Sequence, residues 1–65
     1  MDRVIVREVN GVRTYMGYLG ETANINEAIR YRDDRAIRNR VTVLNSMGTG
    51  GTWKVVSYDK MKNLR

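Results

Sequence analysis

The stretch "VIVREVNGVRTYMGYLG", residues 4–20, decides the fold because it places a turn signal between two runs of strand-forming residues. The signal is Asn10-Gly11, since Asn-Gly is the pair that most readily adopts the positive φ angles of a type I′ turn. A two-residue loop also sets which residues face each other, namely Val9/Val12, Glu8/Arg13, Arg7/Thr14, Val6/Tyr15 and Ile5/Met16. One pair is opposite in charge and another is β-branched against aromatic, and both arrangements favour this register.

The two faces of the predicted hairpin are both partly apolar. Alternation places Val4, Val6 and Tyr15 on one face, which we expect to form the core. The opposite face carries Ile5, Met16 and the valines near the turn, diluted by polar residues. A second apolar face predicts either another element that covers it or a surface for self-association.

A further strand-forming run, "TWKVVSYDKM", occupies residues 52 to 61. We expect it to form one strand, with Trp53 packed in the core rather than stacked on a base. It follows the glycine-rich connector "MGTGG", residues 47–51, in which Gly48 is a helix C-cap signal. The basic tail, about residues 61–65, is expected to be frayed.

Between these runs lies "ANINEAIRYRDDRAIRNRV", residues 23 to 41, whose apolar spacing breaks the helical period at Arg32 and Asp33. Asp33 or Asp34 is a suitable N-cap, so we expect a helix from about 34 to 47. The apolar stripe of this helix is expected to comprise Ala36, Ile37, Val41, Leu44 and Met47.

The residues before the helix are predicted to form a turn, Asn24 to Glu27, and then a short extended piece, Ala28 to Arg32, that is a candidate third strand. The predicted class is therefore α+β, a small two-layer fold of order β-β-(β)-α-β in which an antiparallel sheet packs on one helix. Residues 1–65 make one domain with a single small core. Its largest contributors are expected to be Tyr15, Leu44 and Trp53.

The composition excludes several kinds of chemistry. Cysteine and histidine are absent, so disulfides, the commonest general base and the commonest zinc ligand are all missing. Asp33-Asp34 suits helix capping better than catalysis, and "GTGGT", residues 48–52, lacks the lysine of a phosphate-binding loop. We therefore expect no enzyme, catalytic residue, cofactor, metal or small-molecule substrate. The longest apolar run is three residues, so we expect no transmembrane helix or signal peptide, and a cytoplasmic location.

The charge distribution suggests a polyanionic or acidic partner. The net charge is +5 and the pI is about 10.1, which favours contact with nucleic acid or with an acidic protein surface. The segment from 27 to 40 contains five arginines but also three carboxylates, so ordinary surface ion pairs explain the same layout. The candidate contact residues are Arg7 and Arg13 of the hairpin and Arg30, Arg32, Arg35 and Arg38 around the helix start.

The order of these segments resembles a loose class of short proteins encoded by bacteriophages and prophages. The resemblance lies in an N-terminal hairpin, then "NINEAIRY", then "DDRAIRNRVTVLN", then glycines and "WKVVSYD". It covers most of the chain, and it implies a small α+β fold without implying an activity.

A second, partial resemblance is to the plant-type AP2 DNA-binding domain, in which a three-stranded sheet packs on a helix. It is carried by "YLGETANINEAIRYRDDRAI", residues 18–37. The matching positions are Tyr18, Leu19, Gly20, Asn24, Glu27, Ala28, Asp33 and Ala36. The similarity implies contact with DNA through Arg3, Arg7 and Arg13, although here a further strand is expected after the helix.

Two functional hypotheses follow. The first is a small phage-type accessory protein that acts without catalysis by binding a host or phage protein, or a second copy of itself. The second is a nucleic-acid-binding module that uses the arginines of the hairpin and the helix.

Overall fold

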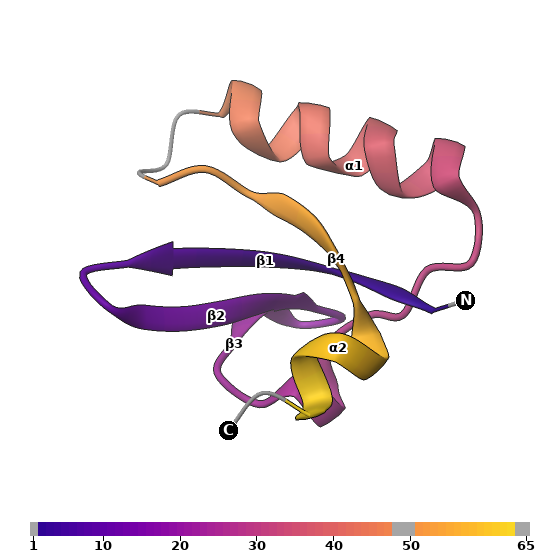
Figure 1. Cartoon of the computed structure of the whole chain (residues 1–65). Coiled ribbons are helices and arrows are strands. Elements are labelled where there is room, and N and C mark those ends of the chain that lie inside the picture. The colour runs from indigo at the N-terminus through magenta and orange to yellow at the C-terminus, as the bar shows by residue number, and fades with distance from the viewer. Residues whose placement is uncertain (1, 48–50, 64–65) are drawn as a thin grey trace.

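The chain folds into an antiparallel sheet of four strands that lies between two helices (Figure 1). The computed structural model describes residues 2–47 and 51–63. Its elements are β1 (Arg3–Val9), β2 (Val12–Gly17), β3 (Gly20–Thr22), the 3₁₀ helix η1 (Ile25–Glu27), α1 (Asp34–Ser46), β4 (Lys54–Ser57) and α2 (Tyr58–Asn63). The strand order across the sheet is β3-β2-β1-β4. The predicted α+β class and the order β-β-β-α-β are confirmed.

The first hairpin has the register expected from its turn. The paired residues are Val6/Tyr15, Arg7/Thr14, Glu8/Arg13 and Val9/Val12. Both turn residues have positive φ, 54° for Asn10 and 80° for Gly11, as a type I′ turn requires. The register is confirmed because a two-residue turn leaves the flanking strands no other pairing.

The third strand lies closer to the hairpin than the sequence predicted. β3 follows β2 through a tight turn at Tyr18 and Leu19, and Gly17 pairs with Gly20 at the base of this turn. Gly20 has a φ of 119°, which side chains of L-residues rarely permit. A glycine at this position is what allows the chain to reverse after β2.

Residues Ala28 to Arg32, predicted as a candidate third strand, do not form one. They make only isolated bridges, Ala28 with Gly17 and Tyr31 with Arg3. The prediction was wrong because β3 already occupies the outer edge of β2. The segment therefore crosses the ends of β2 and β1 on its way to α1.

Side chains cap both helical segments in the middle of the chain. Asn24 Oδ1 accepts a hydrogen bond from the N–H of Asn26 at 3.0 Å, and Asp33 Oδ1 accepts one from the N–H of Arg35 at 2.9 Å. The predicted turn and the predicted helix start are confirmed. The predicted C-cap, Gly48, lies outside the described residues.

The buried stripe of α1 is narrower than predicted. Ile37 and Leu44 are buried and Val41 is half-buried, whereas Ala36 and Met47 are exposed. The three packed positions are four and three residues apart, so they line one side of the helix. The remaining circumference of α1, which carries its arginines, faces solvent.

Each face of the sheet has its own core. One cluster lies beneath α1 and comprises Ile5, Met16, Ile37, Leu44 and Trp53. The other lies on the side of α2 and comprises Val4, Val6, Tyr15, Ala28, Tyr58 and Met61.

The prediction of a single core shared by Tyr15, Leu44 and Trp53 is wrong, because Tyr15 belongs to the cluster away from α1. β1 is a central strand, and its run Val4-Ile5-Val6 supplies apolar side chains to both faces. The predicted two-layer fold, a sheet packed on one helix, therefore lacks α2. This helix covers the second apolar face of the sheet, which the sequence indicated would need a covering element or a partner (Figure 1).

The last predicted strand is too long. β4 ends at Ser57 and α2 begins at Tyr58, whose N–H donates to the carbonyl oxygen of Asp2 at 2.9 Å. Tyr58 and Met61 are three residues apart, on one side of α2, and both are buried. α2 thus includes residues 61–63 of the tail that was expected to be frayed, and Met61 is the buried residue among them.

Candidate functional site

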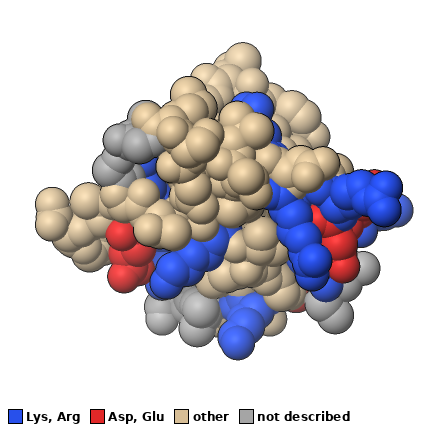
Figure 2. Space-filling model, turned by 90° about the horizontal axis from the view of Figure 1, so that it is seen from above, with Lys and Arg blue, Asp and Glu red and all other residues tan. Residues whose placement is uncertain are grey.

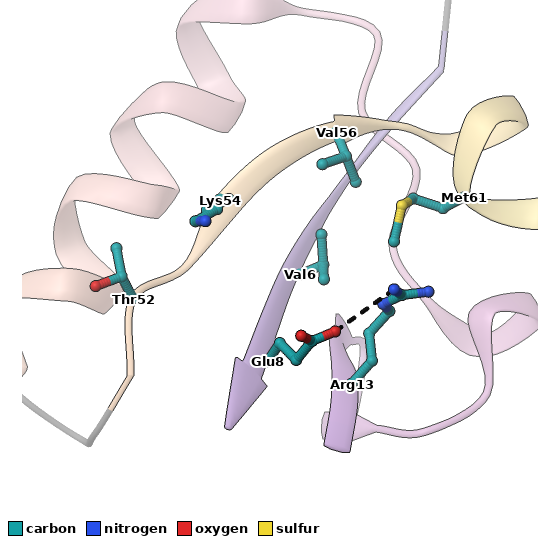
Figure 3. Close-up of a pocket in the computed structure, with 7 residues that line it drawn as sticks. All are labelled: Val6, Glu8, Arg13, Thr52, Lys54, Val56 and Met61. Atoms are coloured by element: carbon teal, nitrogen blue, oxygen red, sulfur yellow. Dashed lines mark hydrogen bonds and ion pairs between the residues drawn. The ribbon is translucent and has the colours of Figure 1, made fainter. Parts of the chain in front are cut away.

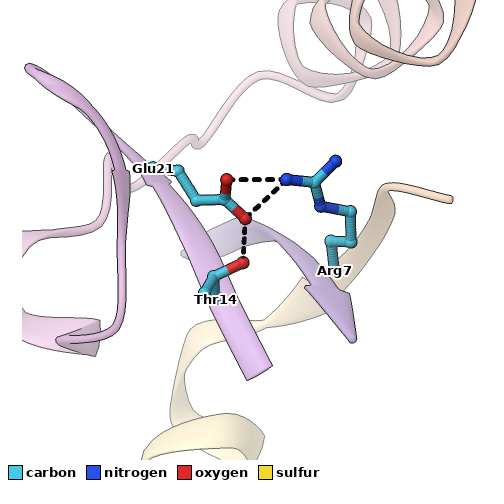
Figure 4. A network of polar contacts seen from close by, with 3 residues as sticks. All are labelled: Arg7, Thr14 and Glu21. Carbon is cyan, nitrogen blue, oxygen red and sulfur yellow. Dashed lines mark hydrogen bonds and ion pairs between the residues drawn. The ribbon is translucent and has the colours of Figure 1, made fainter. Parts of the chain in front are cut away.

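Arg7, predicted as a contact residue, links β1 to β3 across β2. Its Nη2 donates to both carboxylate oxygens of Glu21, at 2.6 and 2.7 Å, and Thr14 also donates to this carboxylate (Figure 4). The hydrogen bonds from Thr14, which is the larger cause, and from Arg7 hold the pKa of Glu21 below its usual value. The Arg7 guanidinium carbon lies 4.4 Å from the centroid of the Trp53 ring. Arg7 is thus part of the packing beside α1.

The other arginines of the hairpin are also engaged. Arg13 lies on the opposite face of the sheet from Arg7, with its Nη2 at 3.5 Å from Glu8 Oε2. Arg3 forms an ion pair with Asp34 at the start of α1. DNA contact through Arg3, Arg7 and Arg13 together would require one surface, and alternation along the strands places Arg13 away from the other two.

The arginines around the helix start are divided between two sides of the molecule. The Arg30 guanidinium lies 4.8 Å from the centroid of the Tyr58 ring, on the α2 side. Arg32 Nε lies 3.3 Å from Asp2 Oδ1. Arg35 and Arg38 are exposed on α1, and they alone remain neighbours, three residues apart on one helix.

The charged side chains do not form one continuous basic patch on the face seen from above α1. Figure 2 shows separate groups of basic side chains divided by uncharged surface, with acidic side chains beside some of them. Among the described residues, four of the basic side chains form ion pairs, namely Arg3/Asp34, Arg7/Glu21, Arg13/Glu8 and Arg32/Asp2. The layout on this face is that of a surface with interspersed charge.

An exposed apolar feature that the sequence reasoning missed lies at the turn between β2 and β3. Tyr18 is 79% exposed and Leu19 is 106% exposed, so neither side chain is covered. We call these two residues the apolar tip. Its signal in the sequence was two large apolar residues enclosed by Gly17 and Gly20, a spacing that is typical of a tight turn.

The base of the apolar tip is closely packed. A Cβ atom on Gly17 would lie 2.8 Å from the backbone oxygen of Glu27 and 3.1 Å from that of Gly20, which shows how near η1 approaches the turn. Glu27 also lies 3.4 Å from the hydroxyl of Thr22. A hollow of about 390 Å³ opens beside the tip, and Glu21 and Glu27 are among its lining residues. The Glu21 carboxylate is paired with Arg7, so Glu27 is the acidic side chain here that has no cationic partner among the described residues.

A second hollow, of about 430 Å³, lies on the α2 side and is lined by residues of β1, β2, β4 and α2. Its apolar floor is formed by Val6, Val56 and Met61, with Arg13 beside Met61 and Lys54 on the other side (Figure 3). Glu8 and Thr52 complete the lining. We call it the hairpin hollow, since it opens beside the ends of β1 and β2 that meet at the first turn. Around this apolar floor the rim carries Lys54 and the ion pair of Arg13 with Glu8.

The acidic residues are dispersed in the part of the chain that the structure describes. No group of three acidic side chains there lies close enough to hold a metal ion, and Asp33 serves as the N-cap of α1. No helix within residues 2–47 and 51–63 is long and apolar enough to cross a membrane. Comparisons of the chain with models of protein families, with curated proteins and with solved structures find no match.

Proposed function

We propose that this chain is a small accessory protein of the kind encoded by phages, which acts in the host cytoplasm by binding a host or phage protein and catalyses no reaction. The observation that carries the proposal is the apolar tip, where Tyr18 and Leu19 stand side by side without any cover. Aromatic and large aliphatic side chains that enter a partner's pocket contribute most to many protein interfaces.

The way the tip is held supports this role. Gly17 is packed against the backbone of η1, and β3 returns from the turn into the sheet. A tip that is already ordered loses little conformational freedom on binding, so more of the contact energy is available for affinity. The lack of histidine and cysteine and the resemblance to small phage-encoded proteins support a binding role without catalysis.

The test uses a photo-crosslinking amino acid in place of Leu19, with a second variant carrying it in place of Val43. Val43 is an apolar residue of α1 that is 49% exposed, and it serves as the matched control. We expect one protein to be crosslinked in host or infected-cell lysate from position 19 and not from position 43. Addition of unlabelled protein should compete, and unlabelled Leu19→Ser should not. Equal crosslinking from both positions would contradict the proposal.

A second candidate function is nucleic-acid binding through α1. The observation that favours it is that Arg35, Arg38 and Arg40 are exposed, and none of them forms an ion pair with a carboxylate of the described residues. Guanidinium groups with no competing carboxylate suit phosphate contact. Arg35 and Arg38, three residues apart, share one side of α1 and can contact adjacent phosphates, whereas Arg40 lies on another side of the helix.

Titration against duplex DNA and RNA at low salt tests this alternative. Binding should weaken as salt rises, with a slope of about −0.9 in log K against log salt for each phosphate contact on duplex DNA. Arg35→Ala and Arg38→Ala should each reduce the affinity and the slope, whereas Asp33→Ala should act on stability. Absence of binding in the micromolar range, or an unchanged slope in both arginine variants, would remove this candidate.

A further inference from the structure

One surface of this chain projects and another is recessed. The apolar tip projects from the turn after β2, with Tyr18 and Leu19 uncovered. The hairpin hollow is recessed, and its floor of Val6, Val56 and Met61 is apolar (Figure 3). Placing the tip in the hollow would remove the apolar surface of Tyr18 and Leu19 from water, which is the main favourable contribution to association. Val6 and Met61 are already buried, so the floor contributes mainly through half-buried Val56.

The same two surfaces complement each other in charge. Glu27 lies at the base of the tip and Lys54 lies at the rim of the hollow. Among residues 2–47 and 51–63, no cation forms an ion pair with Glu27 and no carboxylate forms one with Lys54. Arg13, the second cation of the rim, is held by Glu8 at 3.5 Å. The negative charge of Glu27 beside the apolar tip and the positive charge of Lys54 on the rim attract each other, and they select the orientation of the contact.

One copy of the chain cannot make this contact with itself. The tip follows Gly17 at the end of β2, whereas Arg13 lies at the start of the same strand. The tip lies at the turn into β3, one edge of the sheet, and the hollow lies over β1 and β4, toward the opposite edge. A contact between different surfaces on opposite edges of a molecule is head-to-tail, and it leaves a free tip and a free hollow for further copies.

We propose that the occupant of the hairpin hollow is the apolar tip of a second copy of this chain, and that the protein assembles head-to-tail. This inference rests on the proposed function, because both use the apolar tip, Tyr18 and Leu19, as the contact surface. It goes further in naming the partner surface, namely Val6, Val56 and Met61 with the Lys54 rim.

Sedimentation velocity of the purified protein, from micromolar to millimolar concentration, tests the assembly. The mass should rise with concentration above the monomer value of 7.5 kDa and should continue beyond that of a dimer. Leu19→Ser should remain at the monomer mass over the same range. Asn39→Glu, a change of charge at an exposed position of α1, should assemble as the wild type does.

Exchange of the two charges tests the register of the contact. Glu27→Lys and Lys54→Glu should each weaken association by about tenfold or more, since like charges then face each other. An equimolar mixture of the two variants should recover the wild-type assembly, because every contact between unlike copies again pairs a cation with a carboxylate. Circular dichroism and the fluorescence of Trp53 show whether each variant is folded. If Lys54→Glu does not fold, Leu19→Ser and Glu27→Lys still test the tip.

A wild-type mass that stays at that of the monomer would overturn the inference, as would assembly that Leu19→Ser leaves intact. Failure of two folded charge variants to recover assembly on mixing would overturn it as well. None of these results would affect the crosslinking of position 19 to a host or phage protein. The failure of this inference and the failure of the proposed function are therefore separate outcomes.

Discussion

The side-chain amide of Asn45 binds both backbone polar groups of Trp53. Asn45 Oδ1 accepts from the Trp53 N–H at 2.8 Å, and Asn45 Nδ2 donates to the Trp53 carbonyl oxygen at 3.3 Å. This contact joins the last turn of α1 to the residue that precedes β4. The Asn45 amide thus satisfies the backbone N–H and C=O of Trp53, which in a strand would be paired with a neighbouring strand. The Trp53 side chain belongs to the core cluster beneath α1.

Asn45→Ala should therefore destabilise the protein although alanine is the better helix former. The variant leaves two partly buried backbone groups of Trp53 without their partner, and we expect a loss of about 1–3 kcal/mol in the free energy of unfolding. Urea denaturation followed by the fluorescence of Trp53, the chain's only tryptophan, measures it. Asn39→Ala, at an exposed position of the same helix, is the control and should change stability by no more than about 0.5 kcal/mol. Equal midpoints for the two variants would contradict the role of Asn45.

The carboxylate of Glu21 should make stability depend on acid pH. Its pKa in the folded protein is lowered by hydrogen bonds from Thr14 and Arg7. Its contribution is fully present above the ordinary glutamate pKa, about 4.3, and is lost as the pH falls through the lower folded pKa. The free energy of unfolding of the wild type should thus fall below this pH more steeply than that of Glu21→Gln.

Glu8→Gln is the control for this measurement, since it leaves the contact between Glu21 and Arg7 intact and removes a carboxylate 3.5 Å from Arg13. It should keep the acid-dependent loss that Glu21→Gln lacks. The same acid dependence in the wild type and in Glu21→Gln would show that this network does not contribute.

Gly17 should tolerate no side chain, although its φ is not positive. The Cβ atom of Gly17→Ala would lie 2.8 Å from the backbone oxygen of Glu27, and backbone at a packed turn has little freedom to move. We expect a cost of about 1–3 kcal/mol, together with displacement of the apolar tip. Asn26→Ala, at an exposed position of η1, is the control and should change stability by no more than about 0.5 kcal/mol. Thermal denaturation compares the two, and equal midpoints would refute the steric argument.

Met61→Ala should show that the C-terminal helix is part of the core. Met61 is buried against the second face of the sheet, and truncating such a side chain costs about 2–5 kcal/mol. Lys60→Ala, at the exposed neighbouring position, should cost no more than about 0.5 kcal/mol. If α2 contributed nothing, the two variants would unfold at the same temperature.

Local signals in the sequence were sufficient for the hairpin and for the start of α1. Asn10-Gly11 sets its own turn and thereby the register of its strands, and Asp33 caps the helix that follows it. Both depend on interactions between residues close in the chain. The α+β class followed from these elements, because one helix and the strands around it can bury their apolar sides only against each other.

The candidate functional surfaces could not be predicted from local sequence signals in the same way. The arginines looked like one cluster because they are close in sequence, yet Arg30 lies on the side of Tyr58 and Arg35 lies on α1. The helical spacing of Tyr58 and Met61 was hidden within a run of strand-forming residues. The apolar tip was hidden because exposure is a property of the folded surface, and a Tyr-Leu pair reads equally well as core.

The sequence by itself determined where the chain turns, where α1 begins and which residues pair in the first hairpin, since these depend on backbone conformations and capping bonds a few residues long. Only the tertiary structure decided which face α1 covers, that α2 covers the other, and that Tyr18 and Leu19 remain uncovered. The physical reason is that Val4-Ile5-Val6 makes both faces of β1 apolar. Which helix covers which face then depends on packing between segments far apart in the sequence, and a local sequence pattern does not contain that information.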